Sequence, residues 1–301
     1  MQVRVNGELD CAVRSLILKA VETAILPRFG QLNESEISEK TPGELVTIAD
    51  RECEALLSAG LSRILPDARI VGEEACAANE ALLEGLDEGR IWLVDPLDGT
   101  ANFATGKGPF GVIIALADQG ELLAGWIYEP LLNRMCFAAK GGGAFVSVDG
   151  KLAPVRAAPS KSTIVATLAT QFMPMPIREA VDLAASEFEL EPIPRCAAAH
   201  YPALAFGTYQ LALFQRTLPW DHAAGALFLT EAGAHIARWN GDPYVFHDGG
   251  VGILAASDGE TWKRGASAIF ASDQVKAYAL ELERRRPVAP SDKFHPKLQQ
   301  K

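Results

Sequence analysis

The chain has 301 residues, of which 49% are hydrophobic and 22% are charged, and 38 acidic residues against 28 basic ones give a formal net charge of −10. This is the composition of a globular protein with enough length for a large core, and the negative charge disfavours binding to nucleic acid or to anionic membranes. No run of about 18 apolar residues predicts a membrane span, and the opening MQVRVNGELD lacks the apolar core of a signal peptide.

The cysteines favour a reducing compartment. There are five of them, they are scattered, and none forms a C-x-x-C pair. An odd and scattered set argues against a disulfide framework and against a zinc knuckle. We therefore expect a cytoplasmic protein.

The first half of the chain predicts helices and an antiparallel sheet. A helical stripe over 8–26 is followed by a polar, loop-like segment at 31–44, which contains Lys40, and by a second helix at roughly 49–65. Strands are predicted at 45–47, 68–71, 91–94, 112–117, 122–128 and 135–139. The last three are separated by turn residues and predict an antiparallel meander.

The second half has an α/β pattern after a proline-containing linker near 150–160. Helices are predicted at 176–188, 196–207, 220–232 and 259–281, and strands at 164–168, at 210–214 and within 235–256. The tail from Arg284 is charged and contains proline, and we expect it to fray.

The stretch WLVDPLDGTANF, residues 92–103, carries the clearest chemical signal. Asp95 and Asp98 follow an apolar run, and carboxylates this close repel each other unless a cation lies between them or one is protonated. Gly99 leaves the backbone open, so its N–H and that of Thr100 can point at an anion. The whole string favours a hard-metal site beside a phosphate cradle over an acidic surface turn.

Further acidic residues lie at or near the ends of predicted elements. Asp50 is near a helix start, Glu73 follows a strand, and Asp221 opens the helix in WDHAAGALFLTEAGA, whose small residues 223–225 permit close packing. Each alone is explained as a cap or a turn residue. With Asp95 and Asp98 they make five acids, whose oxygens suit magnesium, calcium or manganese and a multi-metal phosphate site.

These motifs resemble the inositol monophosphatase family of metal-dependent, lithium-sensitive phosphomonoesterases. WLVDPLDGTANF and WDHAAGALFLTEAGA match its two signatures, and LVTIAD (45–50) and VGEE (71–74) match its other acidic elements in order. The resemblance covers roughly residues 8–270. It implies the layered αβαβα sugar-phosphatase fold, of α/β (α+β) class, with an antiparallel N-terminal sheet packed with a C-terminal α/β half, and commonly a homodimer.

The same resemblance implies how the two halves share the site. Residues 1–150 would form an N-terminal α+β half that carries most metal ligands. Residues 151–301 would form the C-terminal α/β half that carries Asp221 and the substrate-specificity segments. The site would lie at their junction.

The resemblance also implies a ligand set for two to three Mg²⁺ ions. Glu73, Asp95 and the Leu97 carbonyl resemble the ligands of a first ion. Asp95, Asp98 and Asp221 resemble the ligands of a second, and a third, weaker ion would be held by Glu73 through water.

The catalytic residues implied are Asp50, Thr100 and Glu73. Thr100 and Asp50 resemble the pair that orients and deprotonates the water on the first metal, which attacks phosphorus in line. The second metal would stabilise the leaving alkoxide, and no phosphoenzyme is needed.

The residues expected to contact the substrate differ from the usual family pattern in two segments. The residues assigned to the substrate are Leu97, Gly99, Thr100, His200, Arg216 and Asp221. A glycine followed by serine or threonine is usual where this chain has residues 198–200, and an acidic residue is usual where it has residues 214–216. Expected contacts to myo-inositol hydroxyls are therefore lost. His200 and Arg216 are candidates to bind a second anionic group of the substrate. The alternative interpretation is that His200 only packs within a helix and that Arg216 is a surface residue.

The resulting prediction is a Mg²⁺-dependent phosphomonoesterase for inositol monophosphate or a related polyol or sugar phosphate. Histidinol phosphate, fructose 1,6-bisphosphate and adenosine 3′,5′-bisphosphate are alternatives within the family. A regulatory binding protein that retains the fold is a different alternative, disfavoured because every catalytic acid is present. A purely structural role for the five acids would need five coincidences. The expected partner is a small phosphorylated substrate, with no nucleic acid and no membrane.

Overall fold

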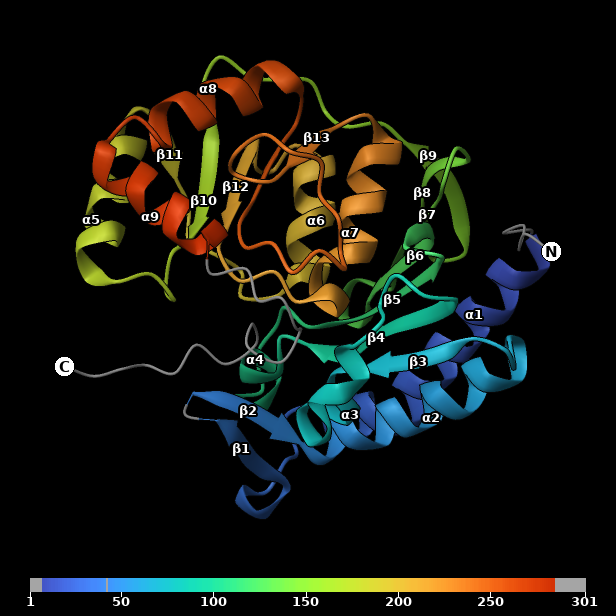
Figure 1. Ribbon diagram of the computed structural model, residues 1–301. Coiled ribbons are helices and arrows are strands. Elements are labelled where there is room, and N and C mark those ends of the chain that lie inside the picture. Colours follow the sequence, from blue (N-terminus) through green and yellow to red (C-terminus); the bar gives the residue numbers. More distant parts are fainter. Residues whose placement is uncertain (1–6, 42, 285–301) are drawn as a thin grey trace. The chain divides into compact units, whose positions relative to one another are not determined.

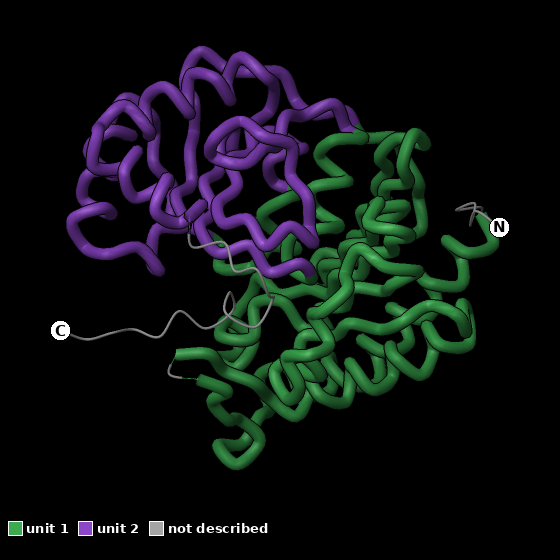
Figure 2. The backbone as a smooth tube through the Cα atoms, viewed as in Figure 1, with its two compact units in different colours: residues 1–155, 194–202, 220–231 green, residues 156–193, 203–219, 232–301 purple. Residues whose placement is uncertain are grey.

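The computed structural model describes residues 7–41 and 43–284. The chain forms two compact units, and Figure 2 colours unit 1 (residues 1–155, 194–202 and 220–231) and unit 2 (residues 156–193, 203–219 and 232–301) separately. This division differs from the expected halves, because two segments of the second half, one of them with Asp221, belong to unit 1. The tail expected to fray beyond Arg284 lies outside the described residues, as do residues 1–6 of the N-terminal segment.

The two N-terminal helices of unit 1 form where the sequence predicts them. Helix α1 (Gly7–Ala20) continues through a π-helical turn (Val21–Ile25) and a 3-10 turn (Leu26–Arg28) that contains Pro27. Helix α2 (Ile48–Ile64) begins at a capping box, in which the Thr47 side chain accepts a hydrogen bond from Ala49 N and the Asp50 carboxylate accepts one from Thr47 N. The apolar stripes of both helices enter one core.

The main sheet of unit 1 has seven strands in sequence order: β3 (Arg69–Gly72), β4 (Arg90–Asp98), β5 (Gly111–Asp118), β6 (Glu121–Glu129), β7 (Arg134–Ala139), β8 (Gly143–Val148) and β9 (Lys151–Val155). From β4 to β9 every pairing is antiparallel, which confirms the meander. The pair β3–β4 is parallel. Its connection, which includes α3 (Glu73–Ala78) and a 3-10 helix (Glu80–Leu83), is long enough for such a crossover.

The polar segment predicted as a loop at 31–44 contains a strand. After a 3-10 turn (Glu34–Glu36), β1 (Ile37–Thr41) pairs antiparallel with β2 (Glu44–Thr47). The expectation of a loop was wrong there, because the strand is held by pairing with β2 and has no apolar alternation of its own.

Both faces of the main sheet are covered, and this explains why β4 to β6 are apolar almost throughout. Side chains on one face, such as Trp92 and Ile114, share a core with α1 and α2, which lie beside the sheet in Figure 1. On the other face, Gly125 lies against Ala224 of α7 (Pro219–Ala232), and Gly111 lies against Ala198 of α6 (Ala197–Ala205). The predicted close packing of the α7 segment 223–225 is therefore present, and it draws these two segments into unit 1.

Unit 2 contains a mixed five-stranded sheet in the order β11 (Glu189–Leu190), β10 (Val165–Ala169), β12 (Leu211–Phe214), β14 (Ile253–Ala256), β13 (His235–Ala237). The first three strands are parallel to one another, and β14 and β13 pair antiparallel. Its helices are α5 (Met175–Ala184), α8 (Gly259–Ile269) and α9 (Asp273–Arg284). The single helix predicted at 259–281 is thus two helices. The second begins after Ser272, whose hydroxyl caps it by accepting a hydrogen bond from Val275 N.

The two units together confirm the mixed α/β class. In the parts of the chain that the structure covers, 7–41 and 43–284, no helix combines the length and the apolar character needed to cross a bilayer.

Gly125→Ala tests the contact between the sheet and α7. A Cβ at this position would lie 2.8 Å from Ala224 Cα and 2.9 Å from Ala224 Cβ, so the helix would have to shift. We expect a loss of about 1–3 kcal/mol in the free energy of unfolding, measured by urea denaturation of the full chain. Gly7→Ala is the control, because nothing lies within 4 Å of a Cβ there. Equal stability of the two variants would contradict the close packing.

A candidate metal and phosphate site in unit 1

The end of β4 delivers the two aspartates of the first motif. Asp95 is 1% exposed and lies opposite Ile113 in the ladder, whereas Asp98 lies opposite Gly111, with an irregular register between them. Leu97 N donates a hydrogen bond of 3.0 Å to Asp95 Oδ1. The irregular turn therefore fixes the Asp95 carboxylate against its own backbone.

Three carboxylates converge from three separate elements. Glu73 at the start of α3, Asp95 on β4 and Asp221 in the first turn of α7 each offer one oxygen, and these oxygens all lie within 4.8 Å of one another. Burial, followed by the charges of Glu73, Asp98 and Asp221, raises the pKa of Asp95 well above its usual range.

This cluster fits a hard divalent cation. It has oxygen donors only, which suits magnesium, calcium or manganese. Its charges repel one another unless a cation or protons offset them. Of the five acids that the sequence singled out, the cluster brings together Glu73, Asp95 and Asp221.

Asp98 is held beside this cluster by the start of α6. Ala198 N donates a hydrogen bond of 2.6 Å to Asp98 Oδ2, and Cys196 Sγ lies 3.8 Å from the Asp98 carbonyl oxygen, to which it donates. Burial raises the pKa of Asp98 to about 6 even though the Ala198 N–H favours its charged form. The segment that departs from the family pattern thus contacts a predicted metal ligand through its backbone.

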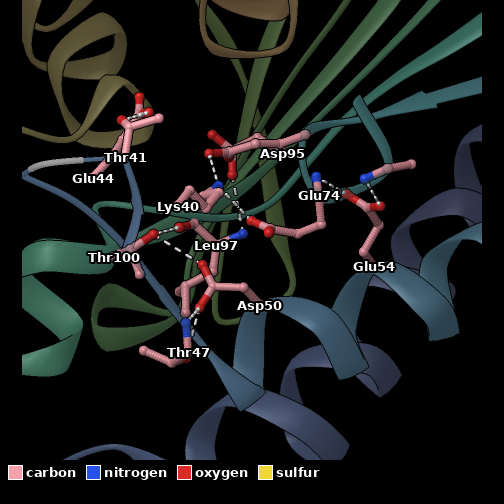
Figure 3. A network of polar contacts seen from close by, with 12 residues as sticks. Lys40, Thr41, Glu44, Thr47, Asp50, Glu54, Glu74, Asp95, Leu97 and Thr100 are labelled. Carbon is pink, nitrogen blue, oxygen red and sulfur yellow. Dashed lines mark hydrogen bonds and ion pairs between the residues drawn. The ribbon is translucent and has the colours of Figure 1, made fainter. Parts of the chain in front are cut away.

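Asp50 and Thr100 come together as the sequence predicts. The Thr100 hydroxyl lies 2.9 Å from Asp50 Oδ1 and 2.9 Å from the Leu97 carbonyl oxygen, and it has one proton to donate between them. Asp50 Oδ2 accepts from Thr47 N at 2.8 Å and from Thr47 Oγ1 at 2.6 Å. Figure 3 shows this network with Asp50 between the two threonines. Burial raises the pKa of Asp50 to about 6.

Gly99 opens the short helix α4 (Thr100–Ala104) in a left-handed conformation. Its φ is 84°, and a Cβ there would lie 2.8 Å from the Pro109 carbonyl oxygen. A side chain is therefore excluded on two grounds. The first N–H groups of a helix lack partners within it, so this turn suits the predicted phosphate cradle, which stays a prediction.

Lys40 is an ion-pair partner rather than a solvated lysine. Its Nζ lies 2.6 Å from Glu73 Oε1 and 2.7 Å from Glu74 Oε1, and all three side chains are largely buried. Burial alone would lower the pKa of Lys40, but the two glutamates raise it above its usual value. Burial, with the charge of Glu73, also raises the pKa of Glu74 to about 7. Lys40 thus supplies part of the positive charge that the acidic cluster needs.

The sequence analysis missed Glu54, which fixes the backbone next to Glu73. Its two carboxylate oxygens each accept a hydrogen bond of 2.8 Å, one from Glu74 N and the other from Ala75 N. A Cβ on Gly72 would lie 2.5 Å from the Glu54 carboxylate, so a side chain there would displace it from these two N–H groups. Glu54 follows Asp50 by four residues on α2 and so shares its face, and this spacing is the signal that would have found it.

The two predicted specificity residues, His200 and Arg216, lie in different surroundings. His200 is 3% exposed, and burial lowers its pKa to about 3, so its ring is uncharged at neutral pH. This favours the packing interpretation over contact with an anion. Arg216 belongs to unit 2, where its guanidinium carbon lies 5.5 Å from the centre of the Phe172 ring. Its contact with substrate stays a prediction.

Known proteins match the chain over most of its length. An "Inositol-1-monophosphatase" from Mesorhizobium japonicum is 34% identical over 230 residues, which cover 74% of this chain and 83% of the relative. A "Nus factor SuhB" from Vibrio cholerae is 30% identical over 245 residues, covering 78% and 84%. The crystal structure of an extragenic suppressor protein suhB from Bartonella henselae superposes with a TM-score of 0.75 at 24% identity, covering 87% of this chain and 98% of that one.

The family itself follows from the match to a family model. The model of the inositol monophosphatase family covers residues 8–274, which include both signatures and all five acids. The chain therefore belongs to the inositol monophosphatase family, and with it to the phosphoric monoester hydrolases.

Proposed function

We propose that this chain is a Mg²⁺-dependent phosphomonoesterase that hydrolyses inositol monophosphate or a related polyol or sugar phosphate. The observation that carries the proposal is the convergence of the Glu73, Asp95 and Asp221 carboxylates within 4.8 Å. Membership of the inositol monophosphatase family supports the reaction class. A cytoplasmic, lithium-sensitive homodimer is part of the same proposal.

The proposed ligand set for two to three Mg²⁺ ions consists of the four carboxylates of Glu73, Asp95, Asp98 and Asp221 and the carbonyl of Leu97. When bound, these ions supply Lewis-acid polarisation of the phosphate and a lower pKa for the attacking water. Two of these carboxylates are also held by the chain's own backbone, since Leu97 N donates to Asp95 and Ala198 N donates to Asp98.

Asp50 and Thr100 are the proposed acceptors of the water's proton. The Thr100 oxygen can accept from a water while its own proton is donated to Asp50 Oδ1 at 2.9 Å. A carboxyl with a pKa of about 6 is ionised at neutral pH and basic enough to take up a proton. Thr47 binds the other oxygen, so Asp50 presents Oδ1 to Thr100.

The leaving group is proposed from the names of relatives. The Mesorhizobium relative is named for inositol 1-monophosphate, and this supports the same class of substrate here. The chain's own residues at 198–200 and 214–216 keep histidinol phosphate, fructose 1,6-bisphosphate and adenosine 3′,5′-bisphosphate as alternatives. The buried, uncharged His200 gives no support for a second anionic group on the substrate.

A regulatory role is the second candidate. One relative, at 30% identity, is named a Nus factor. In this candidate the chain would act as a regulatory binding protein that keeps the fold but not the turnover. The presence of the proposed catalytic residues favours hydrolysis over this candidate.

Phosphate release from a panel of monoesters tests the proposal. We expect one of inositol 1-phosphate, histidinol phosphate, fructose 1,6-bisphosphate or adenosine 3′,5′-bisphosphate to be hydrolysed with Mg²⁺ and not with EDTA. Asp95→Asn should abolish this release, because the variant loses a charge shared by both proposed metal sites.

Asp87→Asn is the matched control for that experiment, because Asp87 is an exposed aspartate of unit 1. It should retain the activity of the parent chain. Near-native turnover by Asp95→Asn at saturating Mg²⁺ would contradict the proposed ligand set. No release from any of the four substrates, with Mg²⁺ still bound, would favour the regulatory candidate.

Asp50→Asn separates proton transfer from metal binding. Asparagine keeps the shape and an acceptor for Thr47, but it cannot take up the water's proton. We expect kcat to fall by about 10²–10⁴-fold, while the Mg²⁺ dissociation constant from calorimetry changes little. An unchanged kcat would remove Asp50 from the reaction.

The pH dependence of Mg²⁺ stabilisation reports on the buried acids. The folded-state pKa values of Asp50 and Asp98 are raised from 3.8 to about 6, so their contribution to stability is present at low pH and is lost as pH rises through about 6. Of the two, Asp98 is a proposed ligand, so Mg²⁺ bound to its ionised form offsets part of this loss. The rise in Tm on adding Mg²⁺ should therefore be larger near pH 7.5 than near pH 5. A rise that is equal at both pH values would argue against carboxylate ligands.

A further inference from the structure

Two helices that are distant from the main sheet in sequence each supply part of the candidate site in unit 1. Helix α6 directs Ala198 N at Asp98 Oδ2, and helix α7 brings in the Asp221 carboxylate. Neither helix adjoins β4 along the chain. Their first turns must therefore be aligned by tertiary contacts.

One buried polar contact joins these two helices close to their first turns. The Tyr201 hydroxyl lies 2.7 Å from His222 Nδ1, and the two rings meet edge to face with their centres 5.8 Å apart. Tyr201 is fully buried and His222 is 4% exposed. A hydrogen bond in such surroundings is costly to break, because its two polar groups would lose their partner without gaining water.

The place of this contact in each helix links it to the site. Tyr201 follows Ala198 by three residues on α6, and His222 directly follows Asp221 on α7. A movement of either ring thus moves the residue that contacts Asp98 or that joins the acidic cluster.

The surrounding packing leaves Tyr201 little freedom. A Cβ on Gly225 would lie 2.1 Å from the Tyr201 ring, so the ring occupies the space that this glycine leaves on α7. The hydroxyl adds a directional contact to this packing, because a hydrogen bond depends on the angle as well as the distance between its partners.

We propose that the Tyr201–His222 hydrogen bond is a positioning contact, which aligns α6 and α7 so that Asp98 and Asp221 bind divalent cations together. The inference rests on one part of the proposed function, namely that the acidic cluster binds divalent cations. In this proposal Tyr201 acts through Ala198, three residues before it on α6, and His222 acts through Asp221, the residue before it on α7. Partners that orient metal ligands are worth about 10–100-fold in metal affinity.

Tyr201→Phe is the direct test, because it removes the hydroxyl and keeps the ring over Gly225. We expect the Mn²⁺ and Mg²⁺ dissociation constants of the full chain, measured by calorimetry without substrate, to rise about 10-fold. The control is Tyr128→Phe, which removes the hydroxyl of another buried tyrosine of unit 1, hydrogen-bonded to Asn133 Oδ1 at 3.2 Å. It should leave the metal affinities unchanged.

A double-mutant cycle separates positioning from general destabilisation. Once the hydrogen bond is gone, losing the second partner should add little, so Tyr201→Phe with His222→Leu should weaken Mn²⁺ binding less than the sum of the single variants. Additive effects, or an affinity of Tyr201→Phe equal to that of the parent chain, would overturn the inference. A Tyr128→Phe variant that loses as much Mn²⁺ affinity as Tyr201→Phe would also overturn it.

The failure of this inference can be told from the failure of the proposed function. A parent chain that binds Mn²⁺ but releases phosphate from no substrate contradicts the phosphatase proposal and leaves the metal-binding comparison valid. Equal Mn²⁺ binding by the parent chain and Tyr201→Phe, with turnover intact, contradicts the positioning role alone. A parent chain that binds neither Mn²⁺ nor Mg²⁺ overturns both.

Discussion

The mutual repulsion of the carboxylates of Glu73, Asp95 and Asp221 is the constraint around which unit 1 is built. Like charges this close, with Asp95 fully buried, oppose folding unless protons or cations offset them. The chain tolerates the arrangement because the supporting backbone is held by its own contacts. Glu54 binds the two N–H groups after Glu73, Leu97 N binds Asp95, and Lys40 pairs with Glu73. These contacts offset part of the repulsion and hold the acids in place, which is what preorganisation requires.

The seven-stranded sheet makes this preorganisation possible, because helices pack on both of its faces. Apolar side chains anchor α1 and α2 to one face, and small residues bring α6 and α7 close to the other. Side chains at the end of β4 are therefore fixed by a packed core and not by a mobile loop. Asp50 gains the same rigidity from the capping box of α2.

The departures from the family pattern have physical consequences in α6. Residues 198–200 keep a backbone N–H for Asp98 although their side chains lack hydroxyl groups. His200 is buried and neutral, so it changes packing rather than charge. Tyr201, the next residue, reaches across to His222.

The sequence by itself determined the strand that delivers Asp95, the turn at Gly99, the helix start at Asp50 and the small residues of α7. Each of these depends on residues within a few positions of one another, where local geometry decides the outcome. The tertiary structure alone decided that 37–41 is a strand, that Lys40 pairs with two glutamates, that Glu54 caps α3, and that the α6 and α7 segments belong to unit 1. These features depend on groups that are brought together from distant parts of the chain, and the burial that fixes their charge states exists only after folding.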